Sequence, residues 1–189
     1  MRVNSDAAFA DDMNRLIAAL PASLVPTSTD LLDALEFSED EEAELQDLFT
    51  AGVALIDDHQ YTAANRIFES AVQLDPYDGE FWLRLGEAHW GAKRLDEAVA
   101  AFARCTTLEP DNTLAWDLSA YVYREQSRFE AALAAWDHVL QIDPSEWDAL
   151  LSRASTLHSL GRMEEADEAE EKAQEVRRQL RRQRREEGG

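Results

Sequence analysis

The sequence predicts an all-α fold of repeated helix-turn-helix units, and three observations support that prediction. Glycine and proline together account for only 12 of the 189 residues, about half of their usual combined share of about 12%, so turns are scarce. Alanine, the best helix former, occurs 30 times. Three of the five prolines, Pro76, Pro110 and Pro144, lie 34 residues apart, and a fixed spacing of this size is typical of repeat architectures.

Residues 1–37 precede the periodic part of the chain and are predicted to form an N-terminal helical segment. Its apolar pattern is interrupted by Pro21 and Pro26, which indicates two short helices. The apolar side chains either form a dimer contact or cap the open end of the first repeat. These side chains are Leu16, Ile17, Leu20, Leu31, Leu32 and Leu35.

Residues 38–176 are predicted to form the repeat domain, because the same kinds of side chain return at the same place in successive units. The units fall at about 45–78, 79–112, 113–146 and 147–180. Large apolar residues occupy the fourth position of each unit, small residues the eighth and twentieth, and aromatic residues the twenty-fourth. The first three units carry these as Leu48, Trp82 and Trp116, then Gly52, Gly86 and Ala120, then Ala64, Ala98 and Ala132, then Phe68, Phe102 and Trp136.

The boundaries of the helices follow from the same pattern. Each repeated proline ends the second helix of a unit, because proline has no N–H to donate to the helix ladder. Asp78, Asn112 and Ser145 follow these prolines and are predicted to cap the first helix of the next unit. Ser38 and Glu41 have the spacing of a capping box that opens the first repeat helix.

The fourth unit departs from the pattern, which predicts that the array ends there. It has Glu170 in place of the large aromatic residue and Arg178 in place of the proline. Residues 177–189 are predicted to form the Arg-rich end of the last helix. Acid at the start of this helix and base at its finish complement the helix dipole.

These in-phase residues resemble the tetratricopeptide repeat, a helix-turn-helix unit of 34 residues. The resemblance covers residues 45–180 and implies a right-handed superhelical solenoid with a concave surface. It also implies that particular positions of the first helix in each unit line a peptide-binding groove. In this sequence they are Phe49, Val53, Ile56, Leu83, Glu87, Trp90, Leu114, Asp117, Tyr121, Arg124, Leu151 and His158. About half of them are expected to touch a ligand, and the rest to pack between repeats.

Composition and motifs exclude or disfavour several classes of function. A net charge of −21 disfavours nucleic-acid binding, which needs a basic surface, and no apolar run is long enough to insert into a membrane. The single cysteine, Cys105, is expected to be buried and fits a reducing cytoplasmic location. No motif for a cofactor, a catalytic group or a metal stands out, so the protein is not expected to be an enzyme.

Two weaker patterns and the basic end were weighed against ordinary structural roles. The run Asp57–His59 could mimic metal ligands, but it falls in a predicted turn where solvated polar residues are usual. Asp148, Ser152 and His158 share one helix face with Ser155 and could mimic a catalytic triad. A polar groove wall is the favoured interpretation. For the Arg-rich end, a contact with nucleic acid or anionic lipid is the alternative to a solvated helix end.

Residues 38–104 also resemble the class II chaperones of bacterial type III secretion. The resemblance lies in Tyr61, Phe68 and the run Leu74–Asp78, followed by Phe81–Gly86. It implies a cytoplasmic chaperone that holds an apolar segment of a secreted translocator in its concave groove, with a possible homodimer through the N-terminal segment. The alternative is a general scaffold that joins proteins in another assembly.

Overall fold

The computed structural model describes residues 41–187, and the predicted all-α repeat fold is confirmed there. Eight helices follow one another in this range, and no strand forms within it. They are α3 (Glu41–Asp57), α4 (Tyr61–Leu74), α5 (Gly79–Gly91), α6 (Leu95–Leu108), α7 (Thr113–Glu125), α8 (Phe129–Ile142), α9 (Trp147–Ser159) and α10 (Met163–Glu187). The predictions for residues 1–37 and for the Ser38 cap lie outside the described residues.

The helix boundaries repeat because the local hydrogen bonds repeat. Asp78 accepts a bond from the Glu80 N–H, and Asn112 accepts one from the Ala115 N–H, so both predicted N-caps are confirmed. The indole N–H of Trp82 donates to the Pro76 carbonyl at 2.9 Å, and Trp116 donates to Pro110 at the same distance. The proline that ends one unit therefore also fixes the first helix of the next.

Ser145 does not cap α9, contrary to the prediction. The N-cap residue is Glu146, whose side chain makes no capping bond. Both the N–H and the hydroxyl of Ser145 donate to the Asp143 carboxylate, at 2.8 and 2.6 Å. An aspartate two residues earlier captures the serine in a local turn, and therefore the serine is not available to the helix.

The turns inside the units share one backbone conformation. His59, Lys93, Ser127 and Gly161 all have positive φ, between 59° and 74°, and lie 34 residues apart. The left-handed region favours glycine, yet only the last unit has glycine there. The turn geometry thus has the period of the sequence although the residue type does not.

The chain divides into two compact units, residues 1–97 and 98–189, with the boundary inside α6. In the first unit α4 packs against α3 and α5, and α3 also contacts α5. The small residue at the eighth position has the predicted role in this unit. A Cβ atom added to Gly52 would lie 2.5 Å from Cζ of Phe68, whose ring is fully buried.

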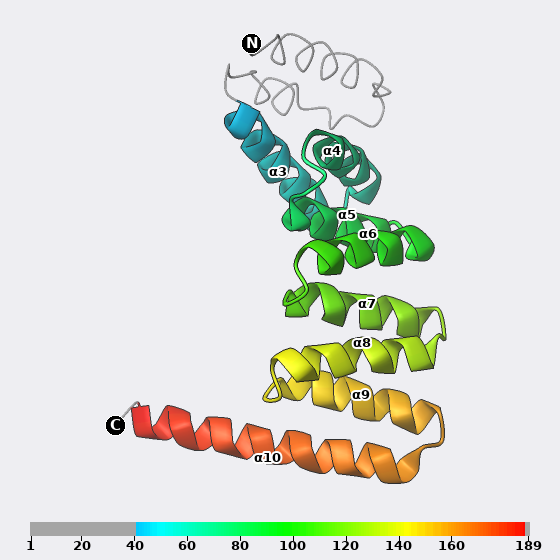
Figure 1. The fold of residues 1–189 in the computed structure, drawn as a ribbon, viewed down its shortest axis with the longest axis vertical. Coiled ribbons are helices and arrows are strands. Elements are labelled where there is room, and N and C mark those ends of the chain that lie inside the picture. Colours follow the sequence, from blue (N-terminus) through cyan, green and yellow to red (C-terminus); the bar gives the residue numbers. More distant parts are fainter. Residues whose placement is uncertain (1–40, 188–189) are drawn as a thin grey trace. The chain divides into compact units, whose positions relative to one another are not determined.

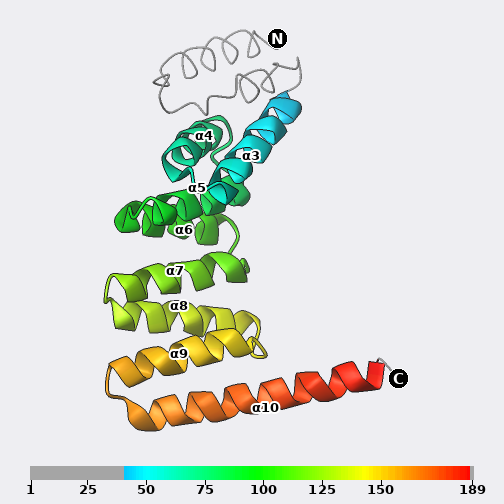
Figure 2. The ribbon, with the colours of Figure 1, turned by 180° about the vertical axis from the view of Figure 1, so that it is seen from behind.

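In the second unit α7, α8, α9 and α10 lie side by side in chain order (Figures 1 and 2). The core of the first three is built on Trp136, which is fully buried among small residues that include Ala120 and Ala149. Cys105 of α6 is buried, as expected.

Helix α10 is the longest helix in the described part of the chain and continues without a break through residue 177. It has 25 residues, whereas its neighbour α9 has 13, and its C-terminal part extends beyond α9 (Figures 1 and 2). The Arg177 guanidinium lies 5.4 Å from the ring centroid of Trp147, the first residue of α9. The Arg-rich end is therefore a helical extension past this contact. None of the helices between residues 41 and 187 has the length and apolar character needed to cross a bilayer.

Candidate functional site

In the first unit, five of the six predicted groove residues are half-buried, and one is part of the core. Leu83 is only 2% exposed, so its side chain belongs to the packed interior and not to an accessible surface. This corrects the prediction for Leu83, where an apolar residue at helical spacing proves to be core. The half-buried residues are Phe49, Val53, Ile56, Glu87 and Trp90.

The accessible part of this surface centres on Phe49. Its ring lies edge-on to those of Phe68 and Phe81, with centroids 6.3 and 6.1 Å away. The Arg84 guanidinium lies 5.8 Å from the Phe49 centroid and pairs with Glu87 at 2.8 Å. Because Arg84 also pairs with a second glutamate of α5, the charged groups around Phe49 largely neutralise one another.

In the second unit, the predicted groove residues include two exposed leucines. Leu114 of α7 and Leu151 of α9 are 45% and 38% exposed. Exposed leucines are common singly, but these two occupy equivalent helix faces of adjacent repeats. They give this surface an apolar character that a partner could cover.

Beside the leucines, α7 and α8 form a polar and aromatic cluster. Tyr121 lies edge-on to Trp136, with centroids 5.6 Å apart, and shares a hydrogen bond of 2.9 Å with the Ser152 hydroxyl. The Arg124 guanidinium lies 5.1 Å from the Tyr121 centroid and 5.7 Å from that of Trp136, a cation–π geometry. Asp117 accepts a bond of 2.8 Å from the Trp136 indole N–H. The residues at three predicted groove positions are thus oriented around one buried indole.

Asp117 has a perturbed acidity, because burial raises the pKa of its carboxyl above the ordinary value. The Trp136 hydrogen bond lowers this pKa, nearby Asp148 raises it, and Arg124 lowers it, with a net increase. A carboxyl with a raised pKa in the folded state binds its proton more tightly there than in the unfolded chain. Its stabilising contribution is therefore complete below the unfolded pKa of about 3.9 and is lost as pH rises through the folded pKa.

We expect Asp117→Asn to raise the free energy of unfolding at pH 7, because the amide oxygen still accepts the indole N–H without a buried charge. The advantage should shrink as the pH approaches 4, where the wild-type carboxyl gains its proton. Urea unfolding at several pH values measures both effects, with the exposed Asp148 changed to Asn as the control. An Asp117→Asn variant that is equally destabilised at both pH values would contradict this account.

The residues that could mimic a triad have other partners. Ser152 bonds to Tyr121, and His158 Nε2 lies 3.0 Å from Glu170 Oε1 of α10. His158 therefore faces the last helix in part, which its position in the sequence alone did not predict. Likewise, His59 in the turn after Asp57 shares a hydrogen bond with Tyr61. In residues 41–187 no group of three or more potential ligands is arranged to hold a metal ion.

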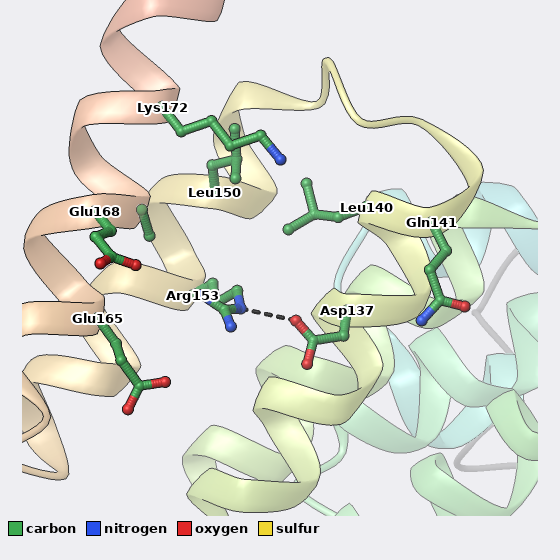
Figure 3. Close-up of a pocket in the computed structure, with 9 residues that line it drawn as sticks. Asp137, Leu140, Gln141, Leu150, Arg153, Glu165, Glu168 and Lys172 are labelled. Carbon is green, nitrogen blue, oxygen red and sulfur yellow. Dashed lines mark hydrogen bonds and ion pairs between the residues drawn. The ribbon is translucent and has the colours of Figure 1, made fainter.

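A cavity of about 420 Å³ on the other side of the second unit was not predicted (Figure 3). It lies among α8, α9 and α10, where Ala169 has a small side chain, and Leu140 and Leu150 form its apolar part. Asp137 and Arg153 bridge it at 2.7 Å. Because charge pairs cross its mouth and little apolar surface is open, we regard the surface with the exposed leucines as the better candidate for binding a peptide.

Comparison with known proteins agrees with the repeat pattern. Two family models, both described as tetratricopeptide repeat, match residues 55–120 and 118–179. A tetratricopeptide repeat domain-containing protein, PYG7 of Arabidopsis thaliana chloroplasts, is 27% identical over 110 residues, which are 55% of this chain and 36% of PYG7. The peroxisomal targeting signal receptor of Komagataella phaffii is 28% identical over 109 residues, or 57% of this chain and 18% of the receptor. The chain thus spans less than two fifths of the length of these relatives.

Solved structures share the fold at low sequence identity. MamA from Desulfovibrio magneticus RS-1 superposes with a TM-score of 0.71 at 18% identity, covering 95% of this chain and 98% of that one. YrrB, described as having an unusual peptide-binding site, gives a TM-score of 0.66 at 20% identity, with coverage of 90% and 82%. The first such domain of Spaghetti (RPAP3), bound to an HSP90 peptide, gives 0.61 at 17% identity, with coverage of 65% and 96%.

Proposed function

Because the chain belongs to the tetratricopeptide repeat proteins, we propose that it is a non-enzymatic module that binds an extended apolar segment of a partner protein. The single observation that carries this proposal is the exposure of Leu114 and Leu151 on equivalent faces of α7 and α9. A partner that covers both leucines would remove apolar surface from water, which favours binding.

The surroundings of the two leucines support a peptide as the ligand. Tyr121 and Arg124 are already oriented by contacts with Trp136, and ordered side chains lose less entropy when a ligand binds. Arg124 supplies N–H donors for the backbone carbonyls or acidic groups of an extended segment. YrrB and the Spaghetti domain, which share the fold, are described with peptide sites of their own.

We expect the double change Leu114→Glu and Leu151→Glu to weaken partner binding at least tenfold, because it places two charges in an apolar contact. Both side chains are exposed in the free protein, so the far-UV circular dichroism should not change. Ile142→Glu is the matched control, since Ile142 is 37% exposed but lies on α8 outside the predicted groove. Quantitative co-purification of partners with each variant measures the effect. If the double variant and the control retained partners equally, the assigned surface would be wrong.

A narrower version of the proposal is a cytoplasmic chaperone for a secreted translocator, which the sequence of residues 38–104 suggests. Such a chaperone would shield the client by mass action and would need no ATP. Mass spectrometry of partners purified from the native host distinguishes it from a general scaffold. An apolar secreted partner supports the chaperone, and a complex of several water-soluble proteins supports the scaffold. A homodimer through residues 1–37 is also a proposal, which light scattering of a chain without residues 1–36 tests.

A further inference from the structure

One face of α10 is acidic in its first half and basic in its second half. The opposite face is occupied by Ala166, Ala169 and Ala173, which are at most 5% exposed. The charged face follows the alternating spacing of four and three residues that keeps side chains on one side of a helix. In order it carries Glu164, Glu168, Glu171, Glu175, Arg178, Arg182 and Arg185, all exposed.

Most of these charges have no partner among the residues that the structure describes. Glu175 and Arg178 form an ion pair of 3.2 Å. Other acidic groups of α10 that do pair lie off this face, such as Glu165 with Arg162 and Glu170 with His158. An isolated α10 therefore presents an acidic stripe and a basic stripe that are end to end and largely unsatisfied.

Helix α10 differs in net charge from the rest of the chain. It has 9 acidic and 7 basic residues, a net charge of −2, so the remainder of the chain carries −21 + 2 = −19. Two copies of the chain repel through most of their surfaces, but at moderate salt this repulsion is screened beyond about 10 Å. The α10 face is the place where a second copy meets complementary charge at short range.

We infer that α10 pairs antiparallel with α10 of a second copy and forms a weak, salt-sensitive homodimer. A two-fold axis beside Gln174 and Glu175 would place the acidic half of each helix on the basic half of the other. Glu171 would then oppose Arg178, and Glu164 would oppose Arg185, each pair occurring twice. The same surface is used by both copies, as two-fold symmetry requires. This contact is separate from the proposed peptide-binding surface on α7 and α9.

The first test is sedimentation velocity of the full chain between about 5 μM and about 500 μM. At about 100 mM NaCl the mass should rise with concentration from 21.3 kDa towards twice that value. At about 500 mM NaCl the dissociation constant should be at least tenfold larger, because salt screens exposed pairs. A mass that stays monomeric over the whole range at the lower salt would overturn the inference.

Two charge-reversal variants test whether α10 is the contact. The first reverses the basic half by Arg178→Glu, Arg181→Glu, Arg182→Glu and Arg185→Glu, and the second reverses the acidic half by Glu164→Arg, Asp167→Arg, Glu168→Arg and Glu171→Arg. Their net charges are −21 − 8 = −29 and −21 + 8 = −13. Each variant alone should remain monomeric, and their equimolar mixture should form a heterodimer. Since both variants are strongly negative overall, net charge alone would not bring them together.

Glutamate near a helix C-terminus opposes the helix dipole, so a variant with four glutamines at the same arginine positions provides a check on helix fraying. It should keep the far-UV circular dichroism of the wild type and still fail to dimerise. A glutamine variant or a basic-half reversal that dimerises as tightly as the wild type would overturn the inference and place the contact elsewhere, for example in residues 1–37.

Disulfide cross-linking tests the antiparallel orientation. Gln174→Cys lies beside the proposed axis, so oxidation should link two copies. Arg185→Cys lies on the same face, but in an antiparallel pair the two cysteines are about 30 Å apart and should not link. Equal cross-linking of both variants would indicate a parallel pair and contradict the proposed geometry. The native Cys105 is buried and does not compete.

Discussion

Replacing Trp136 by alanine should lower the free energy of unfolding of the second unit by about 3 to 5 kcal/mol. Trp136 is fully buried, and Ala120, Ala132 and Ala149 pack around it in the core of α7 to α9. These alanines have no flexible side chains that could fill the cavity. The substitution also removes the indole N–H that bonds to Asp117, leaving a partly buried carboxylate without its donor, which adds to the cost.

Urea unfolding followed by far-UV circular dichroism measures this loss, and two controls separate its causes. Trp136→Phe retains a ring but deletes the N–H donor, so it should cost less than the alanine variant. Trp116→Ala should also cost less, because Trp116 is only partly buried and stacks on His138 with centroids 4.1 Å apart. A Trp136→Ala loss no larger than that of Trp116→Ala would show that Trp136 is not the centre of this core.

Replacing Gly52 by alanine should destabilise the first unit, although alanine favours helices by about 1 kcal/mol relative to glycine. The new Cβ atom would lie 2.5 Å from Cζ of Phe68, a ring with no exposed surface. The two helices must move apart or the ring must leave its rotamer, and overpacking of this kind costs about 1 to 3 kcal/mol. The net change in the free energy of unfolding should therefore be negative.

A double-mutant cycle with Phe68→Leu checks the physical reason. In the Phe68→Leu protein the ring is gone, so Gly52→Ala should be neutral or stabilising there, and the two changes should be strongly non-additive. Additive effects, or an increase in stability from Gly52→Ala alone, would contradict the close approach of α3 and α4. Urea unfolding of the four proteins supplies the comparison.

The period of the sequence was sufficient to predict the helices, because their boundaries depend on neighbouring residues. Pro76 and Pro110 end helices and accept the indole bonds of Trp82 and Trp116, while Asp78 caps α5. Ser145 shows the limit of this reasoning. Its caps were predicted from position alone, but a competing carboxylate two residues earlier formed the stronger local bond.

The candidate site was predicted only in part, because one helical spacing serves both core and surface. Leu83 and Leu151 occupy the same position of their units, yet the first is 2% exposed and the second 38%. The cluster of Tyr121, Arg124 and Trp136 depends on side-chain directions in two helices, which periodicity does not specify. The bond between Tyr121 and Ser152 joins residues 31 positions apart.

By itself, the sequence determined the repeat, the helix punctuation and the small residue at Gly52, because these features are set by local backbone chemistry and a fixed period. It also determined the order of charges along α10. Only the tertiary structure decided which apolar side chains remain exposed and that α10 extends past α9. Burial and reach depend on what packs against each helix, and that information resides in contacts between residues far apart in the chain.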